Sequence, residues 1–384
     1  MHDSTKAVRA NLTRVAAGEP LHSGPVFAAP YHTPGDPHAA PYSYARSHNP
    51  TWTTLERAIA QMESGVFAPG TENAGESYRA SALVFSSGMA ACAAVFGALL
   101  RPGDIVVFPA NAYFAARTLM QDYFVQMGIQ IRLAPTAGDA QGDHLEGAKL
   151  LWIETPSNPT MEIADIAALS ARAHAAGVLV AVDNTTATAL GQRPLALGAD
   201  LSVASDTKSM TGHSDIILGH VAARDRELLQ KVEEWRTLVG GILGSMEAWL
   251  ALRSIPTLPL RLERSSENAM RIAEYLLTRT DVVSRVYYHG LPSHPGHAIA
   301  ARQMQYFGAL LSFELKDKAA ADTFFAKSKL ITEATSFGGT VTCAERRARW
   351  GSDAVSDGFI RLSAGIEHID DLLADIAQAL DALR

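Results

Sequence analysis

Short apolar runs alternate with Ala-rich segments of helical character from residue 82 onward. The runs read ALVF, DIVVFP, IQIRLAP, AKLLWIET, VLVAVDN and DLSVAS, and one intervening segment reads IADIAALSARAHAAG. Strands that are apolar on both faces and are linked by helices are typical of a mainly parallel sheet covered on both sides. The pattern therefore predicts an α/β fold with a mainly parallel sheet covered by helices.

The beginning of the chain has a different character. Residues 18–50 are rich in Gly, Pro, His and Tyr and show neither a helical nor a strand period, so we expect an extended arm. The next stretch, NPTWTTLERAIAQMES, carries apolar residues at helical spacing behind Pro50, which suits the first turn of a helix. A helix is predicted to begin there.

The pattern changes again near residue 240. The long helical stretch VGGILGSMEAWLALRSIPTLPLRLERSSENAMRIAEYLL is followed by the strand-like runs GALLSFEL and FIRLSAGI, with further helices around them. We therefore predict an extended arm over residues 1–50 that contacts a neighbouring subunit, an α/β domain over 51–240, and a smaller α+β domain over 241–384.

Composition narrows the classes of function. The 384 residues carry a formal net charge of -7 and no long basic run, which argues against a nucleic-acid partner and favours small polar ligands. The two cysteines, Cys92 and Cys343, suggest neither a disulfide framework nor a zinc site, so we predict no metal and a reducing, cytoplasmic location. No signal-peptide core and no run of about 18 uncharged apolar residues occurs, so no membrane partner is expected.

The stretch VASDTKSMTGHSD, residues 203–215, places Lys208 close to two hydroxyl side chains, Ser205 and Thr207, directly after an apolar run. One interpretation is a solvated surface lysine at the end of a strand. The other is an amine that forms a Schiff base with a carbonyl, with hydroxyls nearby to hold a phosphate. The rest of the chain has to decide between them.

Polar or small residues also follow other predicted strands, at the sheet edge where ligands bind in open parallel sheets. Gly88, after ALVF, would let a phosphate approach the backbone amides of Gly88 and Met89, although a tight turn has the same sequence. Asp183, after VLVAV, suits a cation such as a protonated pyridine nitrogen, or a structural cap at a strand end.

Two more strand ends carry side chains that suit a flat ligand. Asn158, in TPSNPT, could donate to a ring oxygen or a carboxylate, or occupy a Pro-bracketed turn. Tyr113, in PANAYFAAR, could stack on a ring or transfer a proton, or pack as an ordinary aromatic residue. Together with the lysine, the hydroxyls, the glycine and the acid, these side chains have complementary tasks, and the set predicts a pyridoxal 5'-phosphate (PLP) site.

The chain resembles the Cys/Met-metabolism PLP-dependent enzymes, which include cystathionine γ-lyase, γ-synthase and β-lyase, methionine γ-lyase and O-acetylhomoserine sulfhydrylase. The resemblance runs from about residue 20 to the C-terminus. It rests on YARSHNPTWTTLE, SSGMAA, ETPSNPT, VAVDNT, SDTKSMTGHSD, EAWLALRSIPTL, SFGGT and RLSAGIE, in that order. It implies a fold-type I PLP-dependent transferase-like fold, PLP as cofactor, and a homotetramer that is a dimer of active dimers.

The resemblance also implies roles for single residues. Lys208 matches the lysine that binds the cofactor and removes the Cα proton, Tyr113 the stacking tyrosine that protonates the leaving sulfur, and Asp183 the pyridinium partner. Arg361 matches the arginine that grips the substrate carboxylate. The other implied cofactor-binding residues are Gly88, Met89, Ser205, Thr207 and, reaching a neighbouring subunit, Tyr44 and Arg46; the other substrate-binding residues are Asn158, Ser336 and Thr335.

Two positions depart from the family members that act on cystathionine at Cγ. Those members usually carry an acid before the arm tyrosine and a glutamate before the serine of an SLGG-like motif, where this chain has Ser43 and Thr335. Neither residue can pair with the distal ammonium of cystathionine. Glu333 would share a strand face with Thr335, which leaves partial compensation open. Phe337 replaces the leucine usual in γ-acting members and is similar to the aromatic of some β-lyases.

The resemblance implies a PLP-dependent carbon–sulfur lyase of the transsulfuration type. Our first expectation is cystathionine γ-lyase, which converts cystathionine to cysteine, 2-oxobutyrate and ammonia. Cystathionine γ-synthase, cystathionine β-lyase, and a broader γ-lyase or sulfhydrylase acting on homocysteine or O-acylhomoserine remain alternatives. A nucleotide-binding dehydrogenase is disfavoured because no G-x-G-x-x-G follows a strand. A non-catalytic scaffold would not need the lysine, the acid and both hydroxyls together.

Overall fold

The computed structural model describes residues 1–10, 12, 17–36, 39–65 and 81–384, and two sheets dominate this part of the chain. The larger sheet has the strand order β1-β7-β6-β5-β4-β2-β3. Its strands are β1 (Ser81–Phe85), β2 (Ile105–Pro109), β3 (Gln130–Ala134), β4 (Leu150–Glu154), β5 (Leu179–Asp183), β6 (Leu201–Ala204) and β7 (Gly219–Ala223). All neighbours from β3 to β6 are parallel, and only β7 runs antiparallel to its neighbours β1 and β6. The predicted mainly parallel sheet is confirmed.

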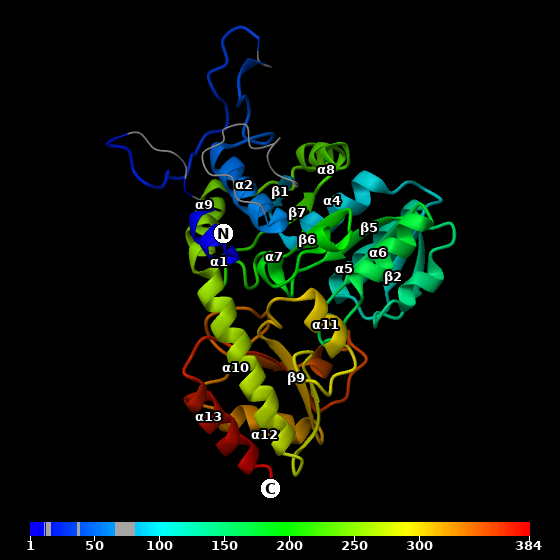
Figure 1. The fold of residues 1–384 in the computed structure, drawn as a ribbon, viewed down its shortest axis with the longest axis vertical. Helices are drawn as coiled ribbons and strands as arrows, with labels where there is room; N and C mark the ends of the chain where they lie inside the picture. The colour runs from blue at the N-terminus through cyan, green and yellow to red at the C-terminus, as the bar shows by residue number, and fades with distance from the viewer. Residues whose placement is uncertain (11, 13–16, 37–38, 66–80) are drawn as a thin grey trace.

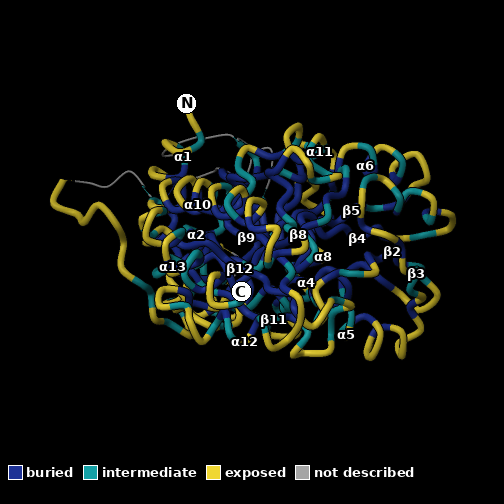
Figure 2. The backbone as a smooth tube through the Cα atoms, turned by 90° about the horizontal axis from the view of Figure 1, so that it is seen from below, coloured by how far each residue is buried: buried dark blue, intermediate teal, exposed yellow. Residues whose placement is uncertain are grey.

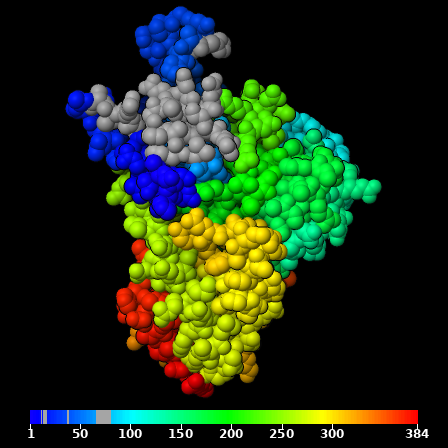
Figure 3. Space-filling model, viewed as in Figure 1, coloured from blue at the N-terminus to red at the C-terminus, as the bar shows by residue number. Residues whose placement is uncertain are grey.

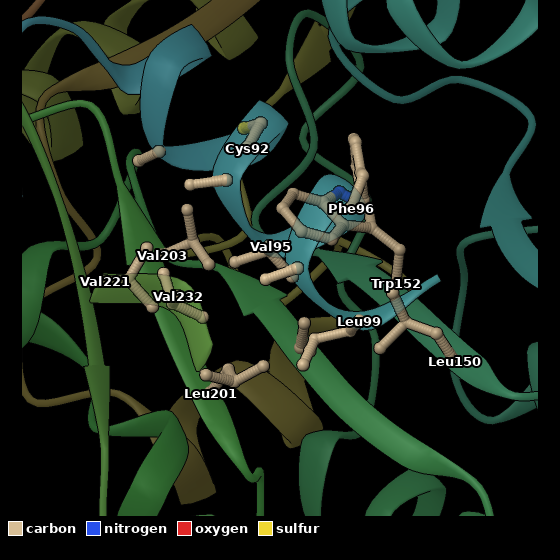
Figure 4. Close-up of a cluster of buried hydrophobic side chains, with 14 of the residues drawn as sticks. Cys92, Val95, Phe96, Leu99, Leu150, Trp152, Leu201, Val203, Val221 and Val232 are labelled. Atoms are coloured by element: carbon tan, nitrogen blue, oxygen red, sulfur yellow. The ribbon is translucent and has the colours of Figure 1, made fainter. Parts of the chain in front are cut away.

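Helices cover both faces of the larger sheet because its central strands are apolar on both sides. Along β4, Leu150 and Trp152 belong to one hydrophobic cluster, whereas Leu151 and Ile153 belong to another. Figure 4 shows Phe96 of α4 in the first cluster with Trp152, and the two ring centroids are 4.7 Å apart. The helices of this part are α2 (Pro50–Ser64), α4 (Gly88–Leu99), α5 (Phe114–Leu119), α6 (Ile166–Ala175), α7 (Thr188–Gly191) and α8 (Arg226–Val239).

Helix α2 begins at the predicted position. The Asn49 side chain accepts a hydrogen bond from Thr51 N at 2.8 Å, and Pro50 occupies the first turn, where a missing N–H costs nothing. The apolar face that the sequence pattern predicts is buried, with Leu55 and Ile59 fully inaccessible. The pattern in this segment therefore identifies both the start of the helix and its buried face.

The smaller sheet has the order β10-β11-β12-β9-β8 and is antiparallel except between β10 and β11. Its strands are β8 (Val283–Tyr287), β9 (Leu310–Leu315), β10 (Thr332–Glu333), β11 (Cys343–Arg346) and β12 (Phe359–Ser363). Helices α10 (Leu258–Thr278), α12 (Lys318–Lys327) and α13 (Ile369–Asp381) share a hydrophobic core with it. The yellow and red C-terminal residues occupy one end of the molecule in Figure 3, and α10 runs along that end in Figure 1.

Buried backbone, dark blue in Figure 2, follows the strands of both sheets, whereas the outer helices and loops are largely exposed. Among the described helices, none combines the length and the apolar character that a membrane crossing requires. Helix α9 (Ser245–Ser254) lies between the two sheet regions in chain order, and α11 (His297–Gln303) lies between β8 and β9. The division of the chain at residues 50 and 240 stays a prediction.

The N-terminal segment begins with a helix that the sequence pattern does not predict. Helix α1 (Asp3–Arg9) buries Ala7, and Lys6 Nζ donates to Gly65 O at 2.6 Å, so its residues pack against the end of α2. The arm that follows extends away from the body (Figure 1) and has one isolated bridge, between Pro30 and Tyr44. Residues 11, 13–16 and 37–38 of the predicted arm, and 66–80 of the predicted α/β domain, lie outside the described residues.

Replacement of Phe96 by alanine tests the first hydrophobic cluster. Phe96 is fully buried and contacts Trp152, Phe108 and Phe124, so its loss should cost roughly 3–5 kcal/mol in the free energy of unfolding. We expect a clear fall in the thermal midpoint of the purified protein, compared with Leu277→Ala at a half-exposed site. Equal midpoints for the two variants would contradict this account of the core.

Candidate active site

A cavity of about 410 Å³ lies between the ends of the larger sheet's strands and the smaller sheet. One wall is formed by residues that end or follow β1, β2, β4, β5 and β6, and the other by residues between 335 and 361. Because the carboxyl ends of parallel strands meet at one edge, side chains distant in sequence converge here. The predicted site residues that line the cavity are Gly88, Met89, Tyr113, Asn158, Asp183, Ser205, Thr207, Lys208, Thr335, Ser336 and Arg361.

Lys208 is a partly buried cavity residue rather than a fully solvated one. Its Nζ donates a hydrogen bond to Ser336 Oγ at 3.0 Å and lies 5.1 Å from the centre of the Phe337 ring. Burial lowers the pKa of the Lys208 amine, and the positive charge of Arg361 lowers it further. A lysine with a lowered pKa is deprotonated more readily, so this amine suits reaction with a carbonyl carbon.

The start of α4 and the turn after β6 form a cup for an anion. Ser87 caps α4, since its side chain accepts a hydrogen bond from Ala90 N at 3.0 Å. A Cβ on Gly88 would lie 2.4 Å from Ser205 Cβ, so glycine alone lets the helix start approach this turn. The first amides of a helix have no partner within it and carry the positive end of its dipole. They are therefore suited to bind a phosphate group.

Thr207 contributes to this cup in a different way from Ser205. Its hydroxyl donates to Leu218 O at 3.1 Å, and Leu218 N donates to the hydroxyl oxygen at the same distance. A hydroxyl has a single proton, so Thr207 has none left for a phosphate oxygen while it binds Leu218. In this arrangement, the backbone amides and Ser205 are the donors for an anion.

Two carboxyl groups lie side by side at the ends of β4 and β5. Glu154 and Asp183 are partners in the register of these strands. Burial raises the pKa of both groups, and the negative charge of Asp183 raises that of Glu154 further. Hydrogen bonds with Thr185 oppose the effect at Asp183, where Thr185 N donates to Oδ1 at 3.0 Å. A cation beside Asp183 would stabilise its ionised form.

Glu154, which the sequence analysis does not single out, holds two predicted site residues in place. Its Oε2 accepts from Tyr113 N at 2.6 Å, and its Oε1 accepts from Asn158 N at 3.3 Å. Burial raises the pKa of the Tyr113 phenol, while Arg347 and Arg361 act in the opposite direction, so the phenol keeps its proton at neutral pH. In the sequence, Glu154 could have been identified in the same way as Asp183, because both are acids at the end of an apolar strand.

Arg361 is fixed by partners from both sides of the cavity. Its Nη1 donates to Asn158 Oδ1 at 2.9 Å, and its Nη2 donates to Ser336 O at 2.8 Å and to Glu345 Oε1 at 2.5 Å. Burial lowers the pKa of Arg361 to about 10, with the carboxylate of Glu345 acting against this effect, so the side chain stays charged at neutral pH. A planar guanidinium held in this way is suited to bind a carboxylate.

The loop before β11 presses against the residue that follows Lys208. Ser336 and Gly338 have left-handed backbone conformations, with φ of 74° and 79°. A Cβ on Gly338 would lie 2.5 Å from Ser209 N. This contact places Ser336 Oγ beside the lysine amine and ties the two walls of the cavity together.

A charged cluster that the sequence analysis missed forms the far rim of the cavity. Glu345 on β11 is fully buried and accepts hydrogen bonds from Arg347 at 2.7 Å, Arg349 at 3.1 Å and Trp350 Nε1 at 2.9 Å, besides Arg361. Its residues belong to the stretch CAERRARW, which has no hydrophobic period and looks like an exposed charged segment. The sequence therefore gives no local signal for the burial of Glu345.

The cluster continues to α5 on the opposite wall. Arg347 Nε donates to Asp353 Oδ2 at 2.9 Å, and Arg117 Nη2 donates to Ser352 O at 2.7 Å. Arg117 lies on α5, which begins directly after Tyr113. The charged cluster thus connects α5, which follows Tyr113, to the smaller sheet, which carries Arg361.

Among the described residues, Glu333 does not take the place of the acid that the loop motif lacks. Thr335 lines the cavity, but Glu333 does not, and Arg349 Nη1 donates to Glu333 Oε1 at 3.0 Å. Ser43 lies in the arm, where its backbone oxygen accepts from Tyr31 N at 3.1 Å. Since the charge of Glu333 is already paired outside the cavity, the compensation considered from the sequence has no support in this geometry.

Tyr44 and Arg46 do not join the other predicted residues in this chain. Both lie in the arm and outside the cavity lining, and the Arg46 guanidinium lies 5.6 Å from the centre of the Tyr44 ring. Tyr44 is 49% exposed. Their roles therefore depend on a second subunit, and remain a prediction.

The donor set of the cavity fits PLP. The close approach of Gly88 to Ser205 leaves an amide-lined cup that suits the phosphate, and the buried Asp183 suits a protonated ring nitrogen. Lys208 lines the same cavity, and its lowered pKa suits a covalent bond to the aldehyde. The residues present therefore match each charged or reactive part of this cofactor.

Comparisons with known proteins indicate one family of enzymes. A family model described as "Cys/Met metabolism PLP-dependent enzyme" matches residues 5–381. A Streptomyces coelicolor protein named "Putative cystathionine gamma-lyase" is 52% identical over 379 residues, which cover 99% of this chain and 93% of that protein. A Lactococcus lactis protein named cystathionine beta-lyase is 39% identical over 352 residues, which cover 88% of each.

A solved structure shows the same architecture. It is cystathionine gamma synthase from Xanthomonas oryzae pv. oryzae in complex with cystathionine, and it covers 99% of this chain and 98% of its own at a TM-score of 0.91 and 36% identity. The agreement over the whole length confirms the predicted fold class. With residues 5–381 matched by the family model and the PLP-compatible cavity, this chain belongs to the Cys/Met-metabolism family of PLP-dependent enzymes, and PLP is its cofactor.

Proposed function

We propose that this enzyme cleaves the Cγ–S bond of cystathionine and releases cysteine, 2-oxobutyrate and ammonia. The observation that carries the proposal is the position of the Lys208 amine, 3.0 Å from Ser336 Oγ, while Ser336 O also holds Arg361. A base and a carboxylate-binding group are thereby anchored to one residue. The relative named for γ-lyase activity, at 52% identity, supports the choice of the Cγ–S bond.

When bound, PLP supplies a ring that withdraws electrons from the substrate Cα. In this proposal Lys208 would bind it covalently and Asp183 would pair with its ring nitrogen. The amides of Gly88 and Met89, with the Ser205 hydroxyl, would hold its phosphate, and Tyr113 would stack on the ring.

The protein's own groups then bind the substrate and move protons. Arg361 and Asn158 hold the α-carboxylate, which fixes Cα and Cβ near the Lys208 amine. The Lys208 amine, released when the substrate amine takes its place, removes the Cα proton. After it has given this proton up, the neutral amine removes a second proton, from Cβ, which elimination at Cγ requires. The Tyr113 phenol, protonated at neutral pH, gives its proton to the sulfur as the Cγ–S bond breaks and cysteine leaves.

We further propose a cytoplasmic homotetramer, a dimer of active dimers. In each active dimer, Tyr44 and Arg46 of one subunit would reach the phosphate site of the other. The support is the arm itself, which extends from the body with both side chains outside its own cavity.

The assignment of Lys208 is tested by reductive trapping. We expect the purified protein to be yellow and borohydride to fix PLP on the peptide that contains Lys208. Lys208→Arg keeps the positive charge but should take up no reducible cofactor, because a guanidinium does not form the covalent bond. A label on another lysine would disprove the assignment, whereas the family membership would stand.

The reaction is tested by incubating the enzyme with L-cystathionine alone and identifying the keto acid. We expect 2-oxobutyrate and cysteine, and a loss of at least about 100-fold in kcat for Lys208→Ala, since the base is removed. Homocysteine should also be converted, because it has no distal ammonium and so does not need the two acids that Ser43 and Thr335 replace.

Two other outcomes would replace the proposed reaction. Pyruvate together with homocysteine would mean elimination at Cβ, as in a β-lyase. Product formation only when cysteine and an activated homoserine are supplied together would mean γ-replacement, as in a γ-synthase. Both outcomes would leave the role of Lys208 intact.

The shared site is tested by mixing two inactive variants. Arg46→Ala should weaken PLP affinity, and Lys208→Ala should be inactive with its arm intact. After subunit exchange, hybrid dimers should regain part of the activity, because one of their two sites receives both wild-type groups. No recovery in a sample with demonstrated exchange would show that each chain builds its own site.

A further inference from the structure

Three ionisable side chains form a buried cluster behind Lys208. His220, on β7, has its Nδ1 2.7 Å from Asp206 Oδ2 and its Nε2 3.1 Å from Glu63 Oε1. The Ser202 hydroxyl also donates to Glu63 Oε1, at 3.1 Å. His220 and Glu63 are each 1% exposed, and none of the three ionisable groups lines the cavity. The mechanism described above makes no use of them.

The geometry calls for a charged imidazole. An ionised carboxylate only accepts hydrogen bonds, so both ring nitrogens of His220 have to donate, and only the imidazolium has two N–H groups. Burial alone lowers the pKa of His220, but Asp206 and Glu63 raise it to about 10. At neutral pH the His220 imidazole is therefore charged and lies between the Asp206 and Glu63 side chains. Removal of the cation would leave buried charges without compensation.

Asp206 connects this cluster to the lysine turn, which we define as residues 205–212. Ser205 and Thr207 on either side of it line the cavity, whereas the Asp206 side chain binds His220. Within the turn, Lys208 N donates to Ser205 O at 3.2 Å, and the backbone oxygen of Asp206 accepts from Thr211 N at 3.1 Å. The Asp206 side chain thus anchors the turn from the side opposite the cofactor cup.

The cluster also joins three elements of the larger sheet region. His220 is the register partner of Val84 on β1 and of Ala204 on β6, and Ala204 directly precedes the lysine turn. Glu63 belongs to the last turn of α2, which packs over the same strands. A displacement of His220 would therefore reach the lysine turn through Asp206.

We propose that His220 is the positioning residue of the cofactor site: held by Glu63, it fixes Asp206 and with it the lysine turn. This inference rests on the assignment of Lys208 but not on which sulfur amino acid is cleaved. Without the imidazolium, Asp206 would be a buried carboxylate with no partner, and the turn would shift to bring it to water. Such a shift would also move Ser205 and Thr207, the two neighbours of Asp206 that line the cavity.

The imidazolium has a second effect, on the carboxyl group that faces the ring nitrogen. Burial raises the pKa of Asp183, and the charge of His220 works with the Thr185 hydrogen bonds to lower it. The ionised form of Asp183 favours a protonated ring nitrogen. Loss of His220 should therefore also alter the visible absorbance of bound PLP, which a general loss of stability would not do.

The test compares His220→Gln and Asp206→Asn with the wild-type enzyme. Hydrogen–deuterium exchange of the peptide spanning residues 204–212, measured with and without PLP, should become about tenfold faster or more in both variants, because the turn opens more often. The dissociation constant for PLP should rise about tenfold or more. The double variant should lose no more PLP affinity and no more protection from exchange than the worse single variant, because both changes disrupt the same cluster.

A matched control is Asp375→Asn. Asp375 is also a buried carboxylate, and it accepts hydrogen bonds from Lys329 N and Leu330 N, far from the lysine turn. It should lower the thermal midpoint without changing PLP affinity or exchange at residues 204–212. If His220→Gln does not fold, Glu63→Gln serves the same comparison, because it weakens the hold on His220 while leaving Asp206 in place.

Wild-type exchange and wild-type PLP affinity in folded His220→Gln would overturn the proposal. Additive losses of PLP affinity in the double variant would also overturn it. An equal loss of PLP affinity and of exchange protection at residues 204–212 in Asp375→Asn would do the same. If reductive trapping shows that Lys208 does not bind PLP, exchange in the cofactor-free protein still reports whether His220 holds the turn. Failure of the positioning role and failure of the lysine assignment are therefore distinguished.

Discussion

The buried carboxyl group of Glu154 fixes the geometry on which the rest of the cavity depends. It accepts the backbone N–H groups of Tyr113 and Asn158, and so sets the positions of two loops that follow different strands. Asn158 in turn binds Arg361 from the smaller sheet. The strand end beneath the cofactor site thereby determines where a substrate carboxylate can lie, although Glu154 itself need not touch the substrate.

Ionic contacts continue this arrangement across the cavity. The Glu345 carboxylate accepts hydrogen bonds from Arg361, Arg347 and Arg349. Arg347 also donates to Asp353, which lies beside α5. Buried ion pairs contribute little net stability unless their geometry is well satisfied, but breaking one partner is costly. The contacts that cross the cavity are those of Arg361 with Asn158 and of Arg117 with Ser352 and Asp353. The cluster of Asp206, His220 and Glu63 behind the lysine turn follows the same rule, because the loss of one partner leaves a buried group unpaired.

The sequence predicted the sheet and the residues at its strand ends because these depend on local pattern. Apolar runs define the strands, and parallel strands bring Lys208 and Asp183 to one edge whatever path the loops take. Glu154 carries the same signal, yet its role depends on two loops whose course no pattern encodes. Glu345 and Arg347 lie in a stretch that looks exposed, and only packing between distant elements buries them. Helix α1 was missed for the same reason, since contacts with α2 stabilise it.

The loop through Ser336 and Gly338 restricts how this active site can diversify. Both residues have left-handed backbone, and Gly338 has no room for a Cβ against Ser209. A side chain at 338 would displace Ser209, the residue that directly follows Lys208. The side chains at Thr335 and Phe337, which border the same cavity, can change without a change in the path of this loop. Substitutions at these two positions are therefore a route to a different substrate range within one architecture.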